Sequence, residues 1–345
     1  MNVPALLPLS AAATAFVVAL VLTPIARYAS LKLGMLDIPN ERSMHVIPTP
    51  RNGGNAILAG ILVAALQSGV WRDHGVFILL MAIIALAVLA IGDARFALPI
   101  RFRFSAQLLV AGAVVILGRV PIVNLGISPP GITAIPFVIG AAAAIFWLTW
   151  MVNAYNFMDG INGLGAVEAL VCGSALALLF TASGDTAGAT MSLVVAAAAA
   201  GFLPWNLPSG SIFMGDVGST ALGLCLAALT LRAAMTMPFL VAFLPLLPFA
   251  FDATFTLLKR WHDGEQIHVA HRKHVYQRLA RQRGSHTFVA ISYGLVATAC
   301  GAAAIIARQW EWPKTLIPVA AALVLLSGIT HVVYYRERLG TAAAP

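Results

Sequence analysis

Apolar segments long enough to cross a lipid bilayer recur along the whole of this 345-residue chain. Crossing the hydrocarbon core takes about 20 mostly apolar residues in a helix. Charged residues make up only 10% of the sequence, against about a quarter in soluble domains. We therefore predict an all-α, polytopic transmembrane bundle that forms one domain over residues 1–345. Eleven spans are predicted, near residues 5–26, 54–71, 76–92, 105–120, 133–152, 164–182, 187–203, 218–232, 236–258, 287–307 and 315–335.

The Lys and Arg residues indicate how these spans are oriented. Basic residues in short loops are retained on the cytoplasmic side, and an odd number of spans puts the termini on opposite sides. With the N-terminus outside and the C-terminus in the cytoplasm, all but five of the 21 Lys and Arg residues fall on the cytoplasmic side. The five exceptions are Arg72, Arg119, Arg232, Arg308 and Lys314. The sequence therefore predicts an N-out, C-in topology.

A net charge of +8 is also typical of proteins that bind nucleic acids. Here the charges lie in short loops between membrane spans and form no groove-sized basic face. We therefore expect no nucleic acid as partner, and instead anionic membrane lipids and an anionic substrate.

Most side chains capable of chemistry fall in the loops that this topology puts in the cytoplasm. These loops cover about residues 27–53, 93–104, 153–163, 204–217 and 259–286. The loops on the other side are short and carry no comparable cluster. We therefore predict an active site at the cytoplasmic surface of the membrane.

Three carboxylates stand where an apolar helix meets one of these loops: Asp93, Asp159 and Asp216. An Asp at membrane depth costs about 2.5–3.5 kcal/mol and needs a partner, a cation or a wet cavity. For any one of them, helix capping is an equally good explanation. Their convergence on one face favours a divalent cation site, with Mg²⁺ as the expected ion and Mn²⁺ as an alternative. Amide oxygens nearby come from Asn153, Asn156 and Asn162.

The longest predicted cytoplasmic loop, 259–286, is rich in basic residues and histidines. His271, Arg272 and His274 make a poor zinc site, because no Cys or third clear ligand accompanies them. They make a good clamp for a diphosphate, which needs several donors. For the outer residues Arg278, Arg281 and Arg283, contact with anionic lipid headgroups is the alternative.

Four ordered motifs in these loops resemble those of one enzyme family. They are Asp37-Ile-Pro-Asn-Glu-Arg-Ser-Met-His45 with Pro48-Thr-Pro-Arg51 and Gly53-Gly54, Asn153 through Leu164 (NxxNxxDGxxGL), Met214-Gly-Asp-Val-Gly-Ser219 (GDxGS), and His271-Arg-Lys-His274 with Tyr276-Gln277 (HRxHxYQ). Over nearly its full length the chain resembles the polyprenyl-phosphate N-acetylhexosamine-1-phosphate transferases, bacterial glycosyltransferase family 4. The eleven-span, N-out bundle of that family agrees with the predicted topology.

The resemblance implies an enzyme of the bacterial inner membrane with its active site on the cytoplasmic face. Undecaprenyl phosphate would attack a UDP-N-acetylhexosamine, UMP would leave, and Mg²⁺ would neutralise the diphosphate. Phosphoryl transfer needs little covalent chemistry from the protein, so a metal, a basic clamp and an oriented nucleophile are sufficient. The product would begin an O-antigen, lipopolysaccharide or similar cell-surface polysaccharide.

By position in the motifs, the resemblance assigns roles to the carboxylates and amides. Asp216 is the first choice as Mg²⁺ ligand. Asp159 and Asn156 would lie near the metal and the nucleotide, with Asp159 as a further metal ligand. Asn153 and Asn162 would support them.

The resemblance also assigns substrate contacts to basic residues. His271, Arg272 and His274 would bind the diphosphate or the sugar phosphate, and His45 and Arg51 would shape the donor or lipid-phosphate pocket. Arg101 and Arg103, at the foot of the fourth span, would hold the polyprenyl phosphate in the headgroup layer. Ordinary positive-inside retention explains this last pair equally well.

The chain departs from the family at two positions. Relatives usually carry two adjacent acids after the third span, whereas this chain has Asp93 followed by Ala94. Asp93 would then be the base that deprotonates the lipid phosphate, or the nucleophile of a two-step reaction. The second departure is Asn162 in place of an Asp, which keeps an oxygen ligand.

Three other functions are weighed against this one. A transporter of anionic or lipid-linked sugars would carry charges near the bilayer midplane and paired repeats with broken helices, whereas the acids inside spans, Glu168 and Asp252, lie near cytoplasmic ends. A membrane scaffold would not need acids, amides and histidines on one face. A phospho-N-acetylmuramoyl-pentapeptide transferase normally has three consecutive histidines in the last large loop, and this chain does not. The sequence leaves open which amino sugar is used and whether the protein forms a homodimer.

Overall fold

The computed structural model of the protein describes residues 7–39, 44–127, 135–266, 269 and 271–342. Asn40, Glu41 and Arg42 of the first motif, and His268 of the long basic loop, lie outside the described residues.

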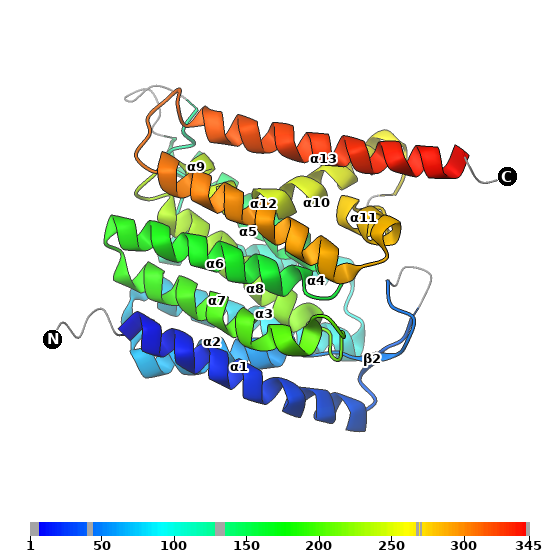
Figure 1. Cartoon of the computed structure of the whole chain (residues 1–345). Helices are drawn as coiled ribbons and strands as arrows, with labels where there is room; N and C mark the ends of the chain where they lie inside the picture. The colour runs from blue at the N-terminus through cyan, green and yellow to red at the C-terminus, as the bar shows by residue number, and fades with distance from the viewer. Residues whose placement is uncertain (1–6, 40–43, 128–134, 267–268, 270, 343–345) are drawn as a thin grey trace.

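The described chain is a bundle of helices that run side by side (Figure 1). The helices are α1 (Leu7–Lys32), α2 (Gly54–Ser68), α3 (His74–Phe96), α4 (Ile100–Gly118), α5 (Phe137–Met158), α6 (Leu164–Ser183), α7 (Thr186–Asn206), α8 (Gly215–Ala233), α9 (Phe239–Phe243), α10 (Leu247–His262), α11 (Val275–Arg283), α12 (His286–Ala307) and α13 (Leu316–Ala342). Short 3₁₀ helices are η2 (Val70–Arg72) and η3 (Leu244–Leu246), and two short strands are β1 (Leu36–Asp37) and β2 (Thr49–Pro50).

Each of the eleven predicted spans overlaps a helix within the described residues, which confirms a polytopic helical membrane bundle. Within the described residues, ten helical segments are long and apolar enough to cross a bilayer. One of these, Phe239–His262, combines α9, η3 and α10. The predicted span near 54–71 corresponds to α2, which is too short to cross the bilayer alone. Its 15 residues measure about 22 Å, less than the hydrocarbon thickness. The 3₁₀ turn η2 continues it as far as Arg72.

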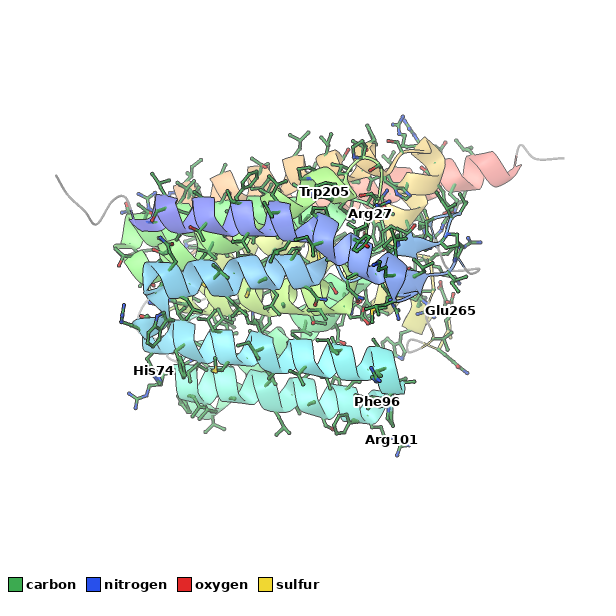
Figure 2. All side chains as sticks on the ribbon, turned by 90° about the horizontal axis from the view of Figure 1, so that it is seen from below. Arg27, His74, Phe96, Arg101, Trp205 and Glu265 are labelled. Atoms are coloured by element: carbon green, nitrogen blue, oxygen red, sulfur yellow. The ribbon has the colours of Figure 1, made fainter. Side chains whose placement is uncertain are left out.

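The two ends of the bundle differ in character. α1 begins at one end and α13 finishes at the other, and β2 and α11 lie at the end where α13 finishes (Figure 1). Figure 2 places Arg101 and Glu265 at this same end, where α3 finishes with Phe96, and His74 at the opposite end. We call the end that holds β2 and α11 the site end. That this end faces the cytoplasm stays a prediction.

At the opposite end, Arg232 has a structural role that explains a basic residue on the predicted outer face. Its guanidinium binds Asp73, with Nη1–Oδ1 at 2.6 Å, and Asp185, with Nε–Oδ2 at 2.6 Å. These two acids are the N-caps of α3 and α7. One cation therefore joins the ends of three helices.

α8 is the most enclosed of the spans that the structure describes. Lipid does not drive helices together by the hydrophobic effect, so close packing relies on small residues. At Gly54 of α2 an added Cβ would lie 2.3 Å from the Cα of Gly218 in α8. Glycine at both positions therefore lets the backbones of α2 and α8 touch beside the first turn of α8.

Gly54→Ala is accordingly expected to lower the thermal stability of the purified protein. A methyl group that meets backbone cannot be accommodated by side-chain motion, and overpacking typically costs about 1–3 kcal/mol. Gly328→Ala is the matched control, since nothing lies within 4 Å of its added Cβ. Equal melting temperatures in detergent for the two variants would contradict the close approach of α2 and α8.

Candidate active site

Two of the four motifs meet where Asn156 contacts Asp216, close enough to Asp159 for the two carboxylates to repel each other. α5 ends at Met158 with Asp159 as its C-cap, and Asp216 lies in the first turn of α8. The Nδ2 atom of Asn156 donates to Oδ1 of Asp216 over 3.2 Å. The structure thus brings together three residues that were predicted to act at one site.

The carboxylate of Asp159 is half-buried and accepts no hydrogen bond from any described residue. Burial, together with repulsion from Asp216, raises the pKa of Asp159 well above its usual range. A carboxylate in this situation either holds a proton or pairs with a cation. When Asp159 is ionised, its environment therefore favours a cation bound to the carboxylate.

The donor set around these carboxylates suits Mg²⁺. Among the described residues no group of three His, Cys, Asp or Glu side chains could hold a metal ion. Mg²⁺ is usually bound by one or two carboxylates, with water and substrate phosphates completing its shell. Asp159 and Asp216 match that pattern, whereas a structural zinc site needs four protein ligands.

Residue Asn206 fixes the loop that carries Asp159. Its Oδ1 accepts from the N–H of Gly163 over 2.5 Å, and its Nδ2 donates to the carbonyl of Ile212 over 2.9 Å. Gly163 has a φ of +81°, a conformation that favours glycine. The side chain thereby joins the loop after α5 to the loop before α8. Sequence reasoning missed Asn206, although an amide in the last turn of an otherwise apolar span was a usable signal.

Further contacts hold the loop before α8 and the helices that flank the two loops. Arg27 donates through Nε to the carbonyl of Ser211 over 3.1 Å, and Trp205 donates to the carbonyl of Leu20 over 3.0 Å; Figure 2 labels both side chains. Within the core, the hydroxyl of Tyr155 donates to the carbonyl of Gly165 over 2.5 Å. The positions of the two carboxylates are therefore set by several helices.

The first motif reaches the site through its backbone. The N–H of Phe213 donates to the carbonyl of Pro50 over 2.8 Å, and the N–H groups of Gly53 and Gly54 donate to the carbonyls of Phe213 and Met214 over 2.9 and 2.8 Å. The segment before α2 therefore lies directly against the segment that leads to Asp216.

This docking places His45 and Arg51 beside the loop before α8. The ring of His45 packs edge-on against Phe213, with 4.8 Å between centroids, and its Nε2 lies 3.3 Å from the carbonyl oxygen of Asp37. The side chain of Arg51 is exposed and makes no hydrogen bond or ion pair to a described residue. Arg51 is therefore available to an anionic ligand.

β1 and β2 pair antiparallel in this segment, with Leu36 opposite Pro50. The sequence did not predict this hairpin, because strands of two residues carry no alternation that could be read.

The basic motif is held by Asp252, a residue buried within α10. Its carboxylate accepts from the N–H groups of Val275 and Tyr276, each over 2.9 Å, and from the Tyr293 hydroxyl over 2.6 Å. The Nδ1 atom of His274 lies 3.3 Å from the same carboxylate. Asp252 thus fixes the start of α11.

α11 in turn docks onto the loop that carries Asp159. The hydroxyl of Tyr276 donates to the carbonyl of Phe157 over 2.9 Å. An added Cβ at Gly160 would lie only 2.2 Å from that hydroxyl oxygen, so glycine is required for the contact. The sequence did not predict α11, because its nine residues lie within a loop that reads only as basic.

Histidine and arginine side chains in this motif divide into buried and exposed groups. His274 is only 3% exposed, and its Nδ1 atom faces Asp252. The predicted contact of this side chain with a diphosphate is therefore restricted to its Nε2 atom. The ring of His271 lies 4.8 Å from that of His274. Burial, together with the neighbouring His274 and Arg260, lowers the pKa of His271 to about 4, so the ring is neutral at pH 7. Arg272 is exposed and its side chain has no described partner.

Arg278, Arg281 and Arg283, for which contact with lipid headgroups is the alternative, contact other side chains of this protein. Arg278 forms an ion pair with Glu337 of α13, and Arg281 lies 3.8 Å from the same carboxylate. Arg283 lies over the ring of Phe288 at 5.1 Å.

Asp93 has a different environment from the other two acids. Its Oδ2 pairs with Nη1 of Arg103 at 2.7 Å, and its Oδ1 accepts from the N–H of Leu98 over 2.9 Å. It makes no hydrogen bond to Asp159 or Asp216 within the described chain. Its role as a base stays a prediction, and acting as one would require release from Arg103.

The remaining predicted residues lie at the edges of the site. Asn153 donates to Gln107 over 2.8 Å, and Asn162 donates to the carbonyl of Pro208 over 3.4 Å. Neither amide hydrogen-bonds to Asp159 or Asp216 among the described contacts. Arg101 is exposed and points outward at the site end (Figure 2).

The chain is a multi-pass helical membrane protein in which carboxylates, amides and basic side chains gather at one end of the bundle, a set of groups suited to phosphoryl transfer. The family model described as "Glycosyl transferase family 4" matches residues 76–234. This range includes Asp93, Asp159 and Asp216. This match and the names of the similar proteins support the family of the polyprenyl-phosphate N-acetylhexosamine-1-phosphate transferases.

Similar curated proteins carry consistent names. The chain is 29% identical over 329 residues to a probable undecaprenyl-phosphate N-acetylglucosaminyl 1-phosphate transferase of Bacillus subtilis, covering 91% of this chain and 88% of the relative. It is 29% identical over 360 residues to a decaprenyl-phosphate N-acetylglucosaminephosphotransferase of Mycobacterium tuberculosis, covering 93% and 87%. An undecaprenyl-phosphate alpha-N-acetylglucosaminyl 1-phosphate transferase of Yersinia pestis is 29% identical over 215 residues, covering 61% and 58%.

Proposed function

We propose that this protein transfers N-acetylhexosamine 1-phosphate from a UDP-sugar to undecaprenyl phosphate and releases UMP. The observation that carries the proposal is the pair of carboxylates from α5 and α8, one of them without a described partner and the other held by Asn156. The names of the relatives support a polyprenyl phosphate as acceptor and favour N-acetylglucosamine as the sugar.

In the proposed reaction an oxygen of the polyprenyl phosphate attacks the β-phosphorus of the UDP-sugar. The bond from that phosphorus to the oxygen shared with the α-phosphate breaks, and UMP leaves. Mg²⁺ held by Asp159 and Asp216 would neutralise charge on the diphosphate. Asn156 orients Asp216, and the exposed cations Arg51 and Arg272 bind phosphate oxygens.

We place this reaction at the cytoplasmic face of the bacterial inner membrane. The loops at the site end carry most of the Lys and Arg residues, which fits retention in the cytoplasm. The product would start a cell-surface polysaccharide, of which O-antigen is one form.

The test is transfer of sugar-labelled UDP-N-acetylhexosamines to organic-extractable lipid by the purified protein with undecaprenyl phosphate. Labelling that requires Mg²⁺ and is specific to one donor would establish the reaction and name the sugar. Label released as free sugar phosphate, or no labelling by a folded protein that binds the acceptor, would overturn the proposal.

Asp93→Asn tests whether this acid acts in the reaction or only holds the connection between α3 and α4. If Asp93 takes the acceptor's proton, kcat falls about 10²- to 10⁴-fold. The ion pair with the 40% exposed Arg103 contributes at most about 1 kcal/mol, so the melting temperature changes little. Arg103→Gln is the matched variant, since it breaks the same pair but keeps the carboxylate. Equal kcat losses in both variants would assign Asp93 to holding the α3–α4 connection.

A further inference from the structure

A groove of about 300 Å³ lies between α10 and α13, apart from the paired carboxylates. Its volume is at the lower end of the roughly 300–1,000 Å³ typical of ligand pockets. Both helices belong to candidate membrane spans, and α13 lies at the edge of the bundle (Figure 1). A groove in this place opens toward lipid.

The side chains that line this groove change in character along its length. α10 contributes Phe251, Phe255 and Lys259, which are four residues apart and share one face of the helix. α13 contributes Thr330, Tyr334 and Arg338 with the same spacing. Aromatic rings therefore line the deeper part, and two cations lie where the groove reaches the site end.

Positive charge gathers around the ring of Tyr334. Nζ of Lys259 lies 5.9 Å from the ring centroid, and the guanidinium of Arg278 lies 4.4 Å from it. Lys259 also pairs with Asp263 at 2.8 Å, but both side chains are more than one-third exposed, and such surface pairs contribute little. The basic end of the groove can therefore accept an anionic headgroup.

Hydroxyl groups in the groove supply a second, independent indication of a ligand. For comparison, Ser292 and Thr298 of the neighbouring α12, outside this groove, donate to carbonyls four residues earlier in their helix, over 2.7 Å each. Thr330 and Tyr334 donate to no group among the described residues, although both line the groove. In a membrane span, a hydroxyl without an acceptor is unfavourable. A ligand with ester or phosphate oxygens would satisfy these groups.

We propose that this groove binds an anionic phospholipid, with its phosphodiester at Lys259 and Arg338 and an acyl chain along Phe251 and Phe255. A lipid fits a groove open to hydrocarbon, and two cations at headgroup level select an anionic headgroup over a zwitterionic one. Binding of this lipid does not depend on the proposed reaction.

The bound lipid also lies close to the residue that orders the basic motif. Phe251 precedes Asp252, and a smaller cavity lined by both of them, together with Thr330, adjoins the groove. Filling the groove therefore supports α10 at the position where Asp252 binds the start of α11. We expect the phospholipid to raise thermal stability.

The test is native mass spectrometry of the full chain in detergent, titrated with phosphatidylglycerol or phosphatidylcholine. We expect the parent chain to bind phosphatidylglycerol more tightly than phosphatidylcholine. In the Lys259→Gln/Arg338→Gln double variant the affinity for phosphatidylglycerol should fall about 30-fold, because the losses from the two basic contacts multiply. The matched control is Arg95→Gln/Arg119→Gln, which removes the same charge from exposed residues outside the groove. Melting temperatures verify that both variants fold.

Three results would overturn the proposal. Equal affinity for the two lipids would remove the headgroup selection, and an equal loss in the control variant would reduce it to general surface charge. Displacement of phosphatidylglycerol by equimolar undecaprenyl phosphate would assign the groove to the acceptor instead. None of these results bears on whether sugar is transferred, so the two proposals fail separately.

Discussion

Asp159→Asn is expected to abolish transfer while leaving the metal-free protein as stable as the parent chain or more stable. The carboxylate is half-buried, accepts no described hydrogen bond and is repelled by Asp216. An amide of the same shape removes both penalties. Loss of a metal ligand removes several kcal/mol of charge stabilisation, which corresponds to at least about 10³-fold in kcat.

The measurement is the melting temperature in EDTA and in Mg²⁺, beside kcat, for both proteins. Mg²⁺ should raise the melting temperature of the parent chain and leave that of Asp159→Asn unchanged, because a ligand stabilises only the state that binds it. Glu311→Gln removes an exposed acid outside the site and should behave like the parent chain. An equal Mg²⁺ response in Asp159→Asn would show that Asp159 is not a metal ligand.

The direction of the pH dependence follows from the same carboxylate. Its pKa in the folded protein is raised, so the unfolded chain releases this proton at lower pH than the folded one. In EDTA the stability of the parent chain should therefore fall as pH rises from about 4, the ordinary pKa of Asp, through the raised value. Asp159→Asn should lack this contribution, which a comparison of the two unfolding curves across pH would measure.

The spans were predictable because each is decided locally. About 20 apolar residues in lipid must form a helix, since no water satisfies the backbone. The hairpin of β1 and β2 and the helix α11 were not predictable in this way. They lie in polar loops, where the conformation depends on contacts with distant segments, such as the bond from Tyr276 to the carbonyl of Phe157.

The candidate site was predicted in part, for a related reason. Residue types and motif order identified Asn156 and Asp216, which are hydrogen-bonded, and Asp159, whose pKa the nearby Asp216 raises. The residues that position them, Asn206 and Asp252, were missed because both lie outside the motifs, Asn206 in the predicted loop 204–217 and Asp252 inside an apolar span. Their function is visible only from the distant backbone groups that they bind.

Asp252→Ala is expected to detach α11 and to inactivate the enzyme. Its carboxylate accepts hydrogen bonds from Val275, Tyr276 and Tyr293, and all three donors would be left buried without an acceptor. An unsatisfied buried donor costs about 1–3 kcal/mol, so the variant should lose several kcal/mol of stability. Because Tyr276 contacts the backbone beside Asp159, the KM for the UDP-sugar should rise as well.

Glu168→Gln is the comparison, because Glu168 is also a buried acid but lacks the partners that Asp252 has. Both are buried inside spans near the site end, but neither carboxyl oxygen of Glu168 has a hydrogen-bond partner among the described residues. Its replacement should leave stability and activity close to those of the parent chain. Limited trypsin digestion provides the local readout, since cleavage after Arg281 and Arg283 of α11 should accelerate in Asp252→Ala alone. Similar protection of α11 in Asp252→Ala and the parent chain would show that the helix is held by its other contacts.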